Sequence, residues 1–154
     1  MIKTISLLIV FLGSSYIGVE ISNSYSKKEK FFREIIRFCD MLINNIGFNK
    51  NKIGVVIENN LDNYSGDLKD CLSSYIAEKS IDVEFLNKYQ NQKINDFFNG
   101  LGGFDVGSEI NYINSYKLIF EDFYEKGKDE NKRYGTLYSK IGIIVGLILV
   151  ILFV

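Results

Sequence analysis

The run Ile141-Gly-Ile-Ile-Val-Gly-Leu-Ile-Leu-Val-Ile-Leu-Phe-Val154 has no polar side chain and decides the class of this protein. A helix needs about 20 mainly apolar residues to cross a hydrocarbon core of about 30 Å. The run reaches about that length when it is extended back to Thr136, with Lys140 directing its ammonium toward the lipid headgroups. The sequence therefore predicts a C-terminal transmembrane helix over residues 136–154.

A second apolar run, at residues 2–21, predicts an N-terminal transmembrane helix, although it contains Ser14, Ser15 and Glu20. A cleaved secretory signal is the alternative, because Lys3 precedes an apolar stretch that ends at the small residues 13–15. Retention in the membrane is favoured because those small residues match a cleavage site poorly and the apolar pattern resumes at Ile17.

Basic residues gather on the inner side of both predicted spans. Lys27, Lys28, Lys30 and Arg33 follow the first span, and Lys126, Lys128, Lys132, Arg133 and Lys140 precede or begin the second. Because basic residues near membrane ends favour the cytoplasmic side, the region 26–133 is expected to be cytoplasmic. Acidic residues concentrate in its middle, at Asp62, Asp67, Asp70, Glu78, Asp82 and Glu84. That acidic surface is either a solvated face or a surface for a cytoplasmic partner, and the charge pattern gives no sign of nucleic-acid binding.

Between the spans, the period of the apolar residues is helical. The stripes are Phe32, Ile35, Ile36, Cys39, Leu42, Ile43 and Ile46; then Leu68, Cys71, Leu72, Tyr75 and Ile76; then Phe85, Leu86, Tyr89, Ile94, Phe97 and Phe98; and finally Val106, Ile110, Ile113, Lys117, Phe120 and Tyr124. Ser65 or Asp67 is the expected N-cap of the second stripe. The β-branched segment 52–58 could be a strand, but a lone strand would lack a partner, so a helix is expected. The sequence thus predicts an all-α protein, a small helical bundle flanked by two transmembrane helices.

The residues of the chain give little support for catalysis. There is no histidine, and neither Cys39 nor Cys71 lies in a metal-binding or redox motif. Both cysteines fall on apolar stripes and are expected to be buried and unpaired. The glycine-rich stretch Gly100–Gly107 lacks the lysine of a phosphate-binding loop. We expect no catalytic residue, no metal and no cofactor.

That glycine-rich stretch is better explained as a corner between two helices. Gly102 and Gly103 permit a left-handed turn after a helix that ends near Phe98. Asp105 is the expected N-cap of the next helix, and Glu109 lies in its first turn, where the helix dipole favours an acid.

Small residues recur in both predicted spans at a spacing of four. Gly142 and Gly146 form a GxxxG motif in the second span, and Ser14 and Gly18 form a looser equivalent in the first. Such residues let helix backbones approach closely, so they are expected either to pack the two spans of one molecule or, as the weaker alternative, to associate two molecules.

The corner and its flanks resemble the stage III sporulation protein AB family of endospore-forming bacteria. The resemblance lies in Leu101-Gly102 and Asp105, with Glu109 where that family has Gln, and in Lys27-Lys-Glu-Lys-Phe-Phe-Arg-Glu34. It extends to Leu137-Tyr138 and to Gly142 with Gly146-Leu-Ile-Leu-Val-Ile-Leu152. The segment 47–63 departs from the family because it lacks a Pro-Leu step.

The resemblance implies a non-enzymatic platform subunit in the mother cell membrane during sporulation, similar to the cytoplasmic helical domain of the platform proteins of type II secretion systems and type IV pili. Its implied partners are a cytoplasmic ATPase and ring-forming sporulation membrane proteins, with a homo-oligomer as a further possibility. An unrelated small adaptor or regulator anchored at both ends is the alternative function.

Overall fold

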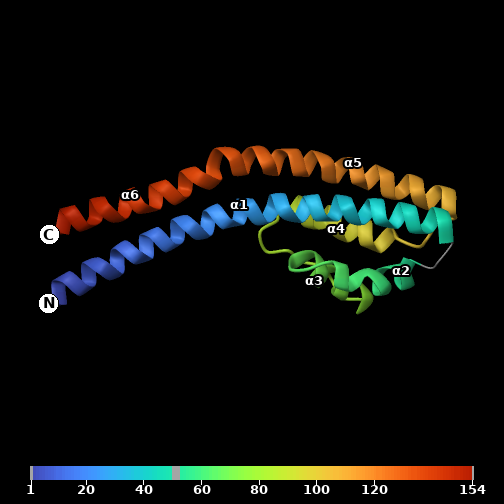
Figure 1. Ribbon diagram of the computed structural model, residues 1–154, viewed down its shortest axis with the longest axis horizontal. Coiled ribbons are helices and arrows are strands. Elements are labelled where there is room, and N and C mark those ends of the chain that lie inside the picture. The colour runs from blue at the N-terminus through green and yellow to red at the C-terminus, as the bar shows by residue number, and fades with distance from the viewer. Residues whose placement is uncertain (1, 50–52, 154) are drawn as a thin grey trace. The chain divides into compact units, whose positions relative to one another are not determined.

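The computed structural model describes residues 2–49 and 53–153, and every regular element in those residues is a helix (Figure 1). The elements are α1 (Ile2–Asn49), α2 (Ile53–Asn60), the short 3-10 helix η1 (Leu61–Asn63), α3 (Asp67–Ile76), α4 (Lys88–Gly100), α5 (Val106–Glu130), the π-helical η2 (Asn131–Gly135) and α6 (Thr136–Phe153). The predicted all-α class is confirmed, and the segment that could have been a strand forms α2.

The chain divides into two compact units. The helical unit is Lys30–Tyr124, and the paired-helix unit contains the earlier part of α1, up to Glu29, together with the chain from Glu125 onward. Helices α1 and α5 each contribute to both units. The limits predicted for the cytoplasmic region, 26–133, concern a membrane boundary and stay a prediction.

Aromatic side chains fill the core of the helical unit. Phe97 of α4 lies at its centre, with its ring centroid 5.3 Å from that of Phe120 on α5 and 6.5 Å from that of Phe38 on α1. All three side chains are fully buried. Edge-to-face and tilted pairs of this kind add a stabilisation of about 0.5–1.5 kcal/mol each beyond the apolar area that they bury. The high aromatic content is therefore explained by core packing.

The buried stripe of α1 is broader than the sequence pattern indicates. Phe31 and Phe38 are buried alongside the predicted members of the stripe, whereas Ile36 and Ile43 are only partly buried. Phe38 contacts α4 through Phe98 and also contacts Tyr64. Because α1 packs against several elements at once, it buries more than the single stripe that one neighbour would require.

The start of α3 differs from its prediction. Its N-cap is Gly66, with φ +64°, and no side chain caps the helix, so neither Ser65 nor Asp67 has the predicted role. Asp67 and Asp70 instead lie in the first turn, where the positive end of the helix dipole favours acids. A glycine at the cap lets the chain enter the helix from a backbone conformation that other residues rarely adopt.

Helix α4 begins later than predicted, at Lys88, and Phe85 and Leu86 precede it. Asn87 and Gln90 form a capping box, in which each side chain accepts a hydrogen bond from the other residue's backbone N–H. Tyr89, predicted to be on the apolar stripe, is 57 % exposed, because the buried face of α4 passes through Gln90 and Ile94 instead.

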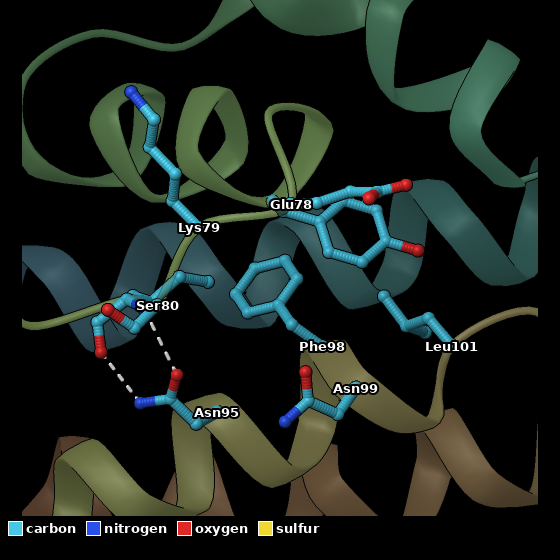
Figure 2. Close-up of a pocket in the computed structure, with 9 residues that line it drawn as sticks. Glu78, Lys79, Ser80, Asn95, Phe98, Asn99 and Leu101 are labelled. Carbon is cyan, nitrogen blue, oxygen red and sulfur yellow. Dashed lines mark hydrogen bonds between the residues drawn. The ribbon is translucent and has the colours of Figure 1, made fainter.

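Two asparagines of α4 hold the extended loop that leads into the helix. The Asn95 amide accepts a hydrogen bond from Ile81 N at 3.1 Å and donates one to Ile81 O at 2.6 Å (Figure 2). Asn91 makes the equivalent pair of bonds with Val83, at 2.9 and 3.0 Å. The side-chain amides thus take the place of a neighbouring strand, and they satisfy the backbone of a loop whose Ile81 and Val83 side chains are buried.

In the paired-helix unit, the earlier part of α1 lies beside the end of α5, η2 and α6 (Figure 1). Lys28 Nζ lies 2.8 Å from Glu130 Oε2, and Asn131 Nδ2 donates to Glu29 Oε2 at 2.7 Å. The ring of Tyr25 stacks on that of Tyr138, with centroids 6.0 Å apart. Polar and aromatic contacts therefore join α1 to the helical stretch of α5, η2 and α6, next to the point where the apolar part of α6 begins.

One helical stretch in the described residues, Val106–Ile151, is long and apolar enough to cross a membrane, judged by length and composition. Its most apolar window has a mean hydropathy of 1.8. The span predicted over residues 2–21 stays a prediction, because the side chains of residues 2–8 and 10 lie outside the described part of the structure.

Candidate functional site

The corner between α4 and α5 is the first of the two candidate sites from the sequence. Helix α4 ends at Gly100, and Gly102 follows with φ +82°, in the left-handed region that favours glycine. Gly103 has an ordinary backbone, and a Cβ there would lie 3.6 Å from the nearest atom, Gly100 O. Of the two predicted glycines, Gly102 is thus the one whose conformation requires glycine.

Asp105 caps α5. Its Oδ1 accepts hydrogen bonds from Gly107 N at 3.1 Å and Ser108 N at 3.2 Å, which satisfies two amides that have no partner within the helix. Hydrogen bonds from Ser108 lower the pKa of the Asp105 carboxyl. The carboxylate therefore acts on the backbone of its own helix.

Glu109 has a role that the sequence did not indicate. It lies in the first turn of α5 but is 98 % buried, with a relative exposure of 2 %, and its carboxylate turns back toward the corner. Oε1 accepts from Gly102 N at 3.0 Å, and Oε2 accepts from Phe104 N at 3.3 Å. A buried carboxylate is costly unless hydrogen bonds compensate it, and here the two corner amides supply them. Glu109 therefore holds the loop in shape.

Tyr112 links the two helices on the other side of the corner. Its hydroxyl donates to Asp96 O at 2.8 Å and lies close to the backbone of Gly100, where a Cβ would clash with the tyrosine ring. Burial raises the pKa of the Tyr112 hydroxyl well above its ordinary value, with smaller contributions from Tyr116 and nearby carboxylates. Tyr112 therefore keeps its proton and remains a hydrogen-bond donor.

The second candidate site is the contact between small residues in the paired-helix unit. A Cβ on Gly18 would lie 2.7 Å from Tyr138 O and 2.9 Å from Gly142 Cα. A Cβ on Gly146 would lie 2.5 Å from Ser14 Oγ. The structure thus places Ser14, Gly18, Gly142 and Gly146 together, in a backbone contact within one molecule that larger residues would force apart.

The two cysteines are buried and free. Burial raises the pKa of the Cys71 thiol to about 12 and moves that of Cys39 even higher. A thiol reacts as its thiolate, so both side chains behave as small apolar core residues at neutral pH.

The chemistry of the two sites is structural. In the corner, the carboxylates of Asp105 and Glu109 both accept from backbone amides, and the helix contact is built from glycines and a serine. Across the described residues, no group of three or more metal-binding side chains comes together.

An ion pair within the helical unit was not predicted from the sequence. Lys117, assigned to an apolar stripe of α5, points its ammonium at Asp40 of α1, with Nζ 2.6 Å from Oδ1. The hydrogen bond to Asp40 raises the pKa of Lys117. The sequence does contain one signal for this ion pair, because Lys117 places a charge in an otherwise apolar stripe.

Comparison with known proteins identifies a family. The family model of stage III sporulation protein AB matches residues 57–154, from α2 through α6. The match includes both the corner and the apolar helix, and it leaves out residues 1–56, which contain the Lys27–Glu34 segment. No curated protein and no solved structure matches the chain.

Proposed function

Because this chain belongs to the stage III sporulation protein AB family, we propose that it is a non-enzymatic scaffold subunit of the complex that joins mother cell and forespore during sporulation. The observation that carries the proposal is the extent of the family match, which takes in the end of α2, the packed helices α3 and α4, and the apolar helical stretch that continues from α5. A membrane helix joined to a small helical bundle is an arrangement suited to holding other proteins at a membrane.

In this proposal, the protein is anchored in the mother cell membrane by residues 2–21 and 136–154, and the helical unit is cytoplasmic. The basic residues next to both segments support that orientation. The backbone contact of Gly18 with Gly142 supports pairing of the two anchors within one molecule.

The proposed partners are a cytoplasmic ATPase and ring-forming sporulation membrane proteins, with self-association as a further possibility. The scaffold would couple the ATPase to the membrane components through its helical unit. A scaffold function is supported by the chemistry of the candidate sites, in which the ionisable side chains bind the protein's own backbone.

Affinity capture tests the scaffold function. The tagged full-length protein would be purified in mild detergent from membranes of sporulating cells, and the proteins recovered with it would be identified. A tagged, unrelated membrane protein with one span serves as the control. We expect an ATPase and ring-forming sporulation proteins to be recovered with this protein and not with the control. Their absence from repeated captures would contradict the scaffold function.

Cysteine labelling tests the orientation. The native thiols are buried, so a cysteine introduced by Asn99→Cys, at an exposed position of α4, would be the reactive one. A reagent that cannot cross membranes should label it in broken cells but not in intact protoplasts. Labelling in intact protoplasts would place the helical unit on the outside and reverse the proposed topology.

A further inference from the structure

The outer face of α6 is a continuous stripe of exposed apolar side chains. Gly142 and Gly146, which contact α1, lie on the opposite side of the helix (Figure 1). The residues of the stripe recur at spacings of four and three, so they lie one above another along the helix. They have exposed fractions from 41 % to 75 % and are Leu137, Ile141, Ile144, Ile148 and Ile151.

Two basic side chains lie at one end of this stripe. Arg133 precedes Leu137 by four residues and Lys140 follows it by three, so both lie on or beside the same face. Both are exposed, and neither forms an ion pair with a carboxylate of the described residues. Arg133 belongs to η2, and π-helical turns within α-helices are frequent at functional sites. The two charges are therefore available to a ligand.

The stripe has the polarity and the length of one phospholipid. Its positive charges lie where the apolar helix begins, and only apolar residues follow Lys140 toward the C-terminus. From Lys140 to Ile151 an α-helix rises by about 17 Å. One leaflet of the hydrocarbon core is about 15 Å deep. Because arginine and lysine form charge-assisted hydrogen bonds with phosphate, a lipid with its phosphate at this end would lay its acyl chain along the whole stripe.

The basic residue at the same level on α1 has no such stripe beneath it. Lys27 precedes Lys28, which pairs with Glu130 next to η2, so Lys27 lies near the level of η2. On its face of α1, four and seven residues earlier, are Asn23 and Glu20, and all three side chains are exposed. An acidic headgroup would be repelled by Glu20. The outer face of α6 therefore fits an acidic lipid better than this face of α1.

We infer that the outer face of α6 binds one acidic phospholipid, whose phosphate contacts Arg133 and Lys140 and whose acyl chain lies along the stripe from Leu137 to Ile151. The inference rests on the part of the proposed function that places residues 136–154 in the membrane, and it adds the class of lipid bound there. A zwitterionic lipid offers the same chains without net charge, so apolar contacts alone would hold it. Charge therefore gives the site its selectivity.

Native mass spectrometry of the full-length protein in detergent tests the site. The protein would be titrated separately with dioleoyl phosphatidylglycerol and dioleoyl phosphatidylcholine, which have the same acyl chains and differ in net charge. Each basic residue beside an anionic membrane surface strengthens binding about fivefold, so two such residues predict a preference of roughly 25-fold for the first bound phosphatidylglycerol. This comparison uses the unmodified protein, so it does not depend on the folding of a variant.

Charge variants locate the site on α6. Lys140→Gln should weaken phosphatidylglycerol binding about fivefold, and Arg133→Gln with Lys140→Gln should reduce it to about the affinity for phosphatidylcholine. Lys27→Gln removes the same charge from the exposed face of α1 and should change the affinity less than about twofold. Glycerol phosphate has the phosphate without the acyl chains, so an excess of about tenfold should not displace the lipid.

Equal affinities for the two lipids would overturn the inference, as would a loss in Lys27→Gln as large as that in Lys140→Gln. Displacement by glycerol phosphate would also overturn it, because the site would then bind anions without using the stripe. Affinity capture from sporulating cells separates the two proposals. If sporulation proteins are recovered but the two lipids bind equally, the scaffold function stands and the lipid site fails. If phosphatidylglycerol is preferred but no sporulation protein is recovered, the lipid site stands alone.

Discussion

Replacement of Glu109 by alanine should destabilise the helical unit by removing the acceptor that holds the corner. The change deletes hydrogen bonds to Gly102 N at 3.0 Å and Phe104 N at 3.3 Å. A hydrogen bond to a charged group contributes about 1.5–3 kcal/mol, and water will replace part of this because both amides belong to exposed residues. We therefore expect the free energy of unfolding to fall by about 2–4 kcal/mol.

That loss should be visible as a lower melting temperature. For a unit of the size of Lys30–Tyr124, 1 kcal/mol corresponds to a shift of about 4–8 °C, so the expected fall is roughly 8–32 °C. The assay is thermal melting of the full-length protein in detergent, followed by near-ultraviolet circular dichroism. This signal reports the packed tyrosine and phenylalanine rings, most of which lie in the helical unit.

Glu109→Gln separates shape from charge in the same assay. Glutamine keeps one acceptor oxygen for the corner and is cheaper to bury than a carboxylate, so the loss should be about 1 kcal/mol or less. Glu58→Ala, at an exposed position of α2, controls for loss of an acid. An alanine variant at 109 that melts within about 3 °C of the wild type would refute the structural role of Glu109.

Three further outcomes follow from local geometry. Gly102→Val should lower the free energy of unfolding by about 1–3 kcal/mol, because the φ of Gly102 is +82°. The control Gly103→Ala should be nearly neutral. Equal melting temperatures for the two variants would contradict this prediction. Gly142→Ala should lengthen the distance between spin labels on α1 and α6, because the new Cβ would lie 2.9 Å from the backbone oxygen of Ser14. The control Gly13→Ala should leave that distance unchanged, because no atom lies within 4 Å of its Cβ position. Burial raises the pKa of Cys71 from 9.0 to about 12, so the unfolded state loses its proton first. The free energy of unfolding should therefore fall as pH rises from 9 to 12, and urea titrations should show a smaller fall for Cys71→Ala.

Local signals predicted the elements of this fold well. The helical periods anticipated the class, and Gly102 and Asp105 anticipated the turn and its cap, because both depend on neighbouring residues. The predicted start of α4 was wrong although its signal is also local. Asn87 and Gln90 have the spacing of a capping box, but the apolar residues Phe85 and Leu86 drew the predicted helix too far back.

Contacts between distant residues could not be predicted in this way. The bonds of Asn95 to Ile81 join residues 14 apart, and the pair of Lys117 with Asp40 joins residues 77 apart. The local periodicity of apolar residues carries no information about contacts between residues this far apart in the sequence.

Glu109 shows why a corner can stay recognisable when one of its residues changes. The resemblance described from the sequence places Glu109 where Gln is expected, and the carboxylate of Glu109 is buried. In the structure, the position supplies an acceptor oxygen to Gly102 N, which either side chain can provide. The carboxylate adds a second acceptor, which Phe104 N uses at the longer distance of 3.3 Å. The geometry of the corner therefore requires a hydrogen-bond acceptor at position 109 rather than a charge.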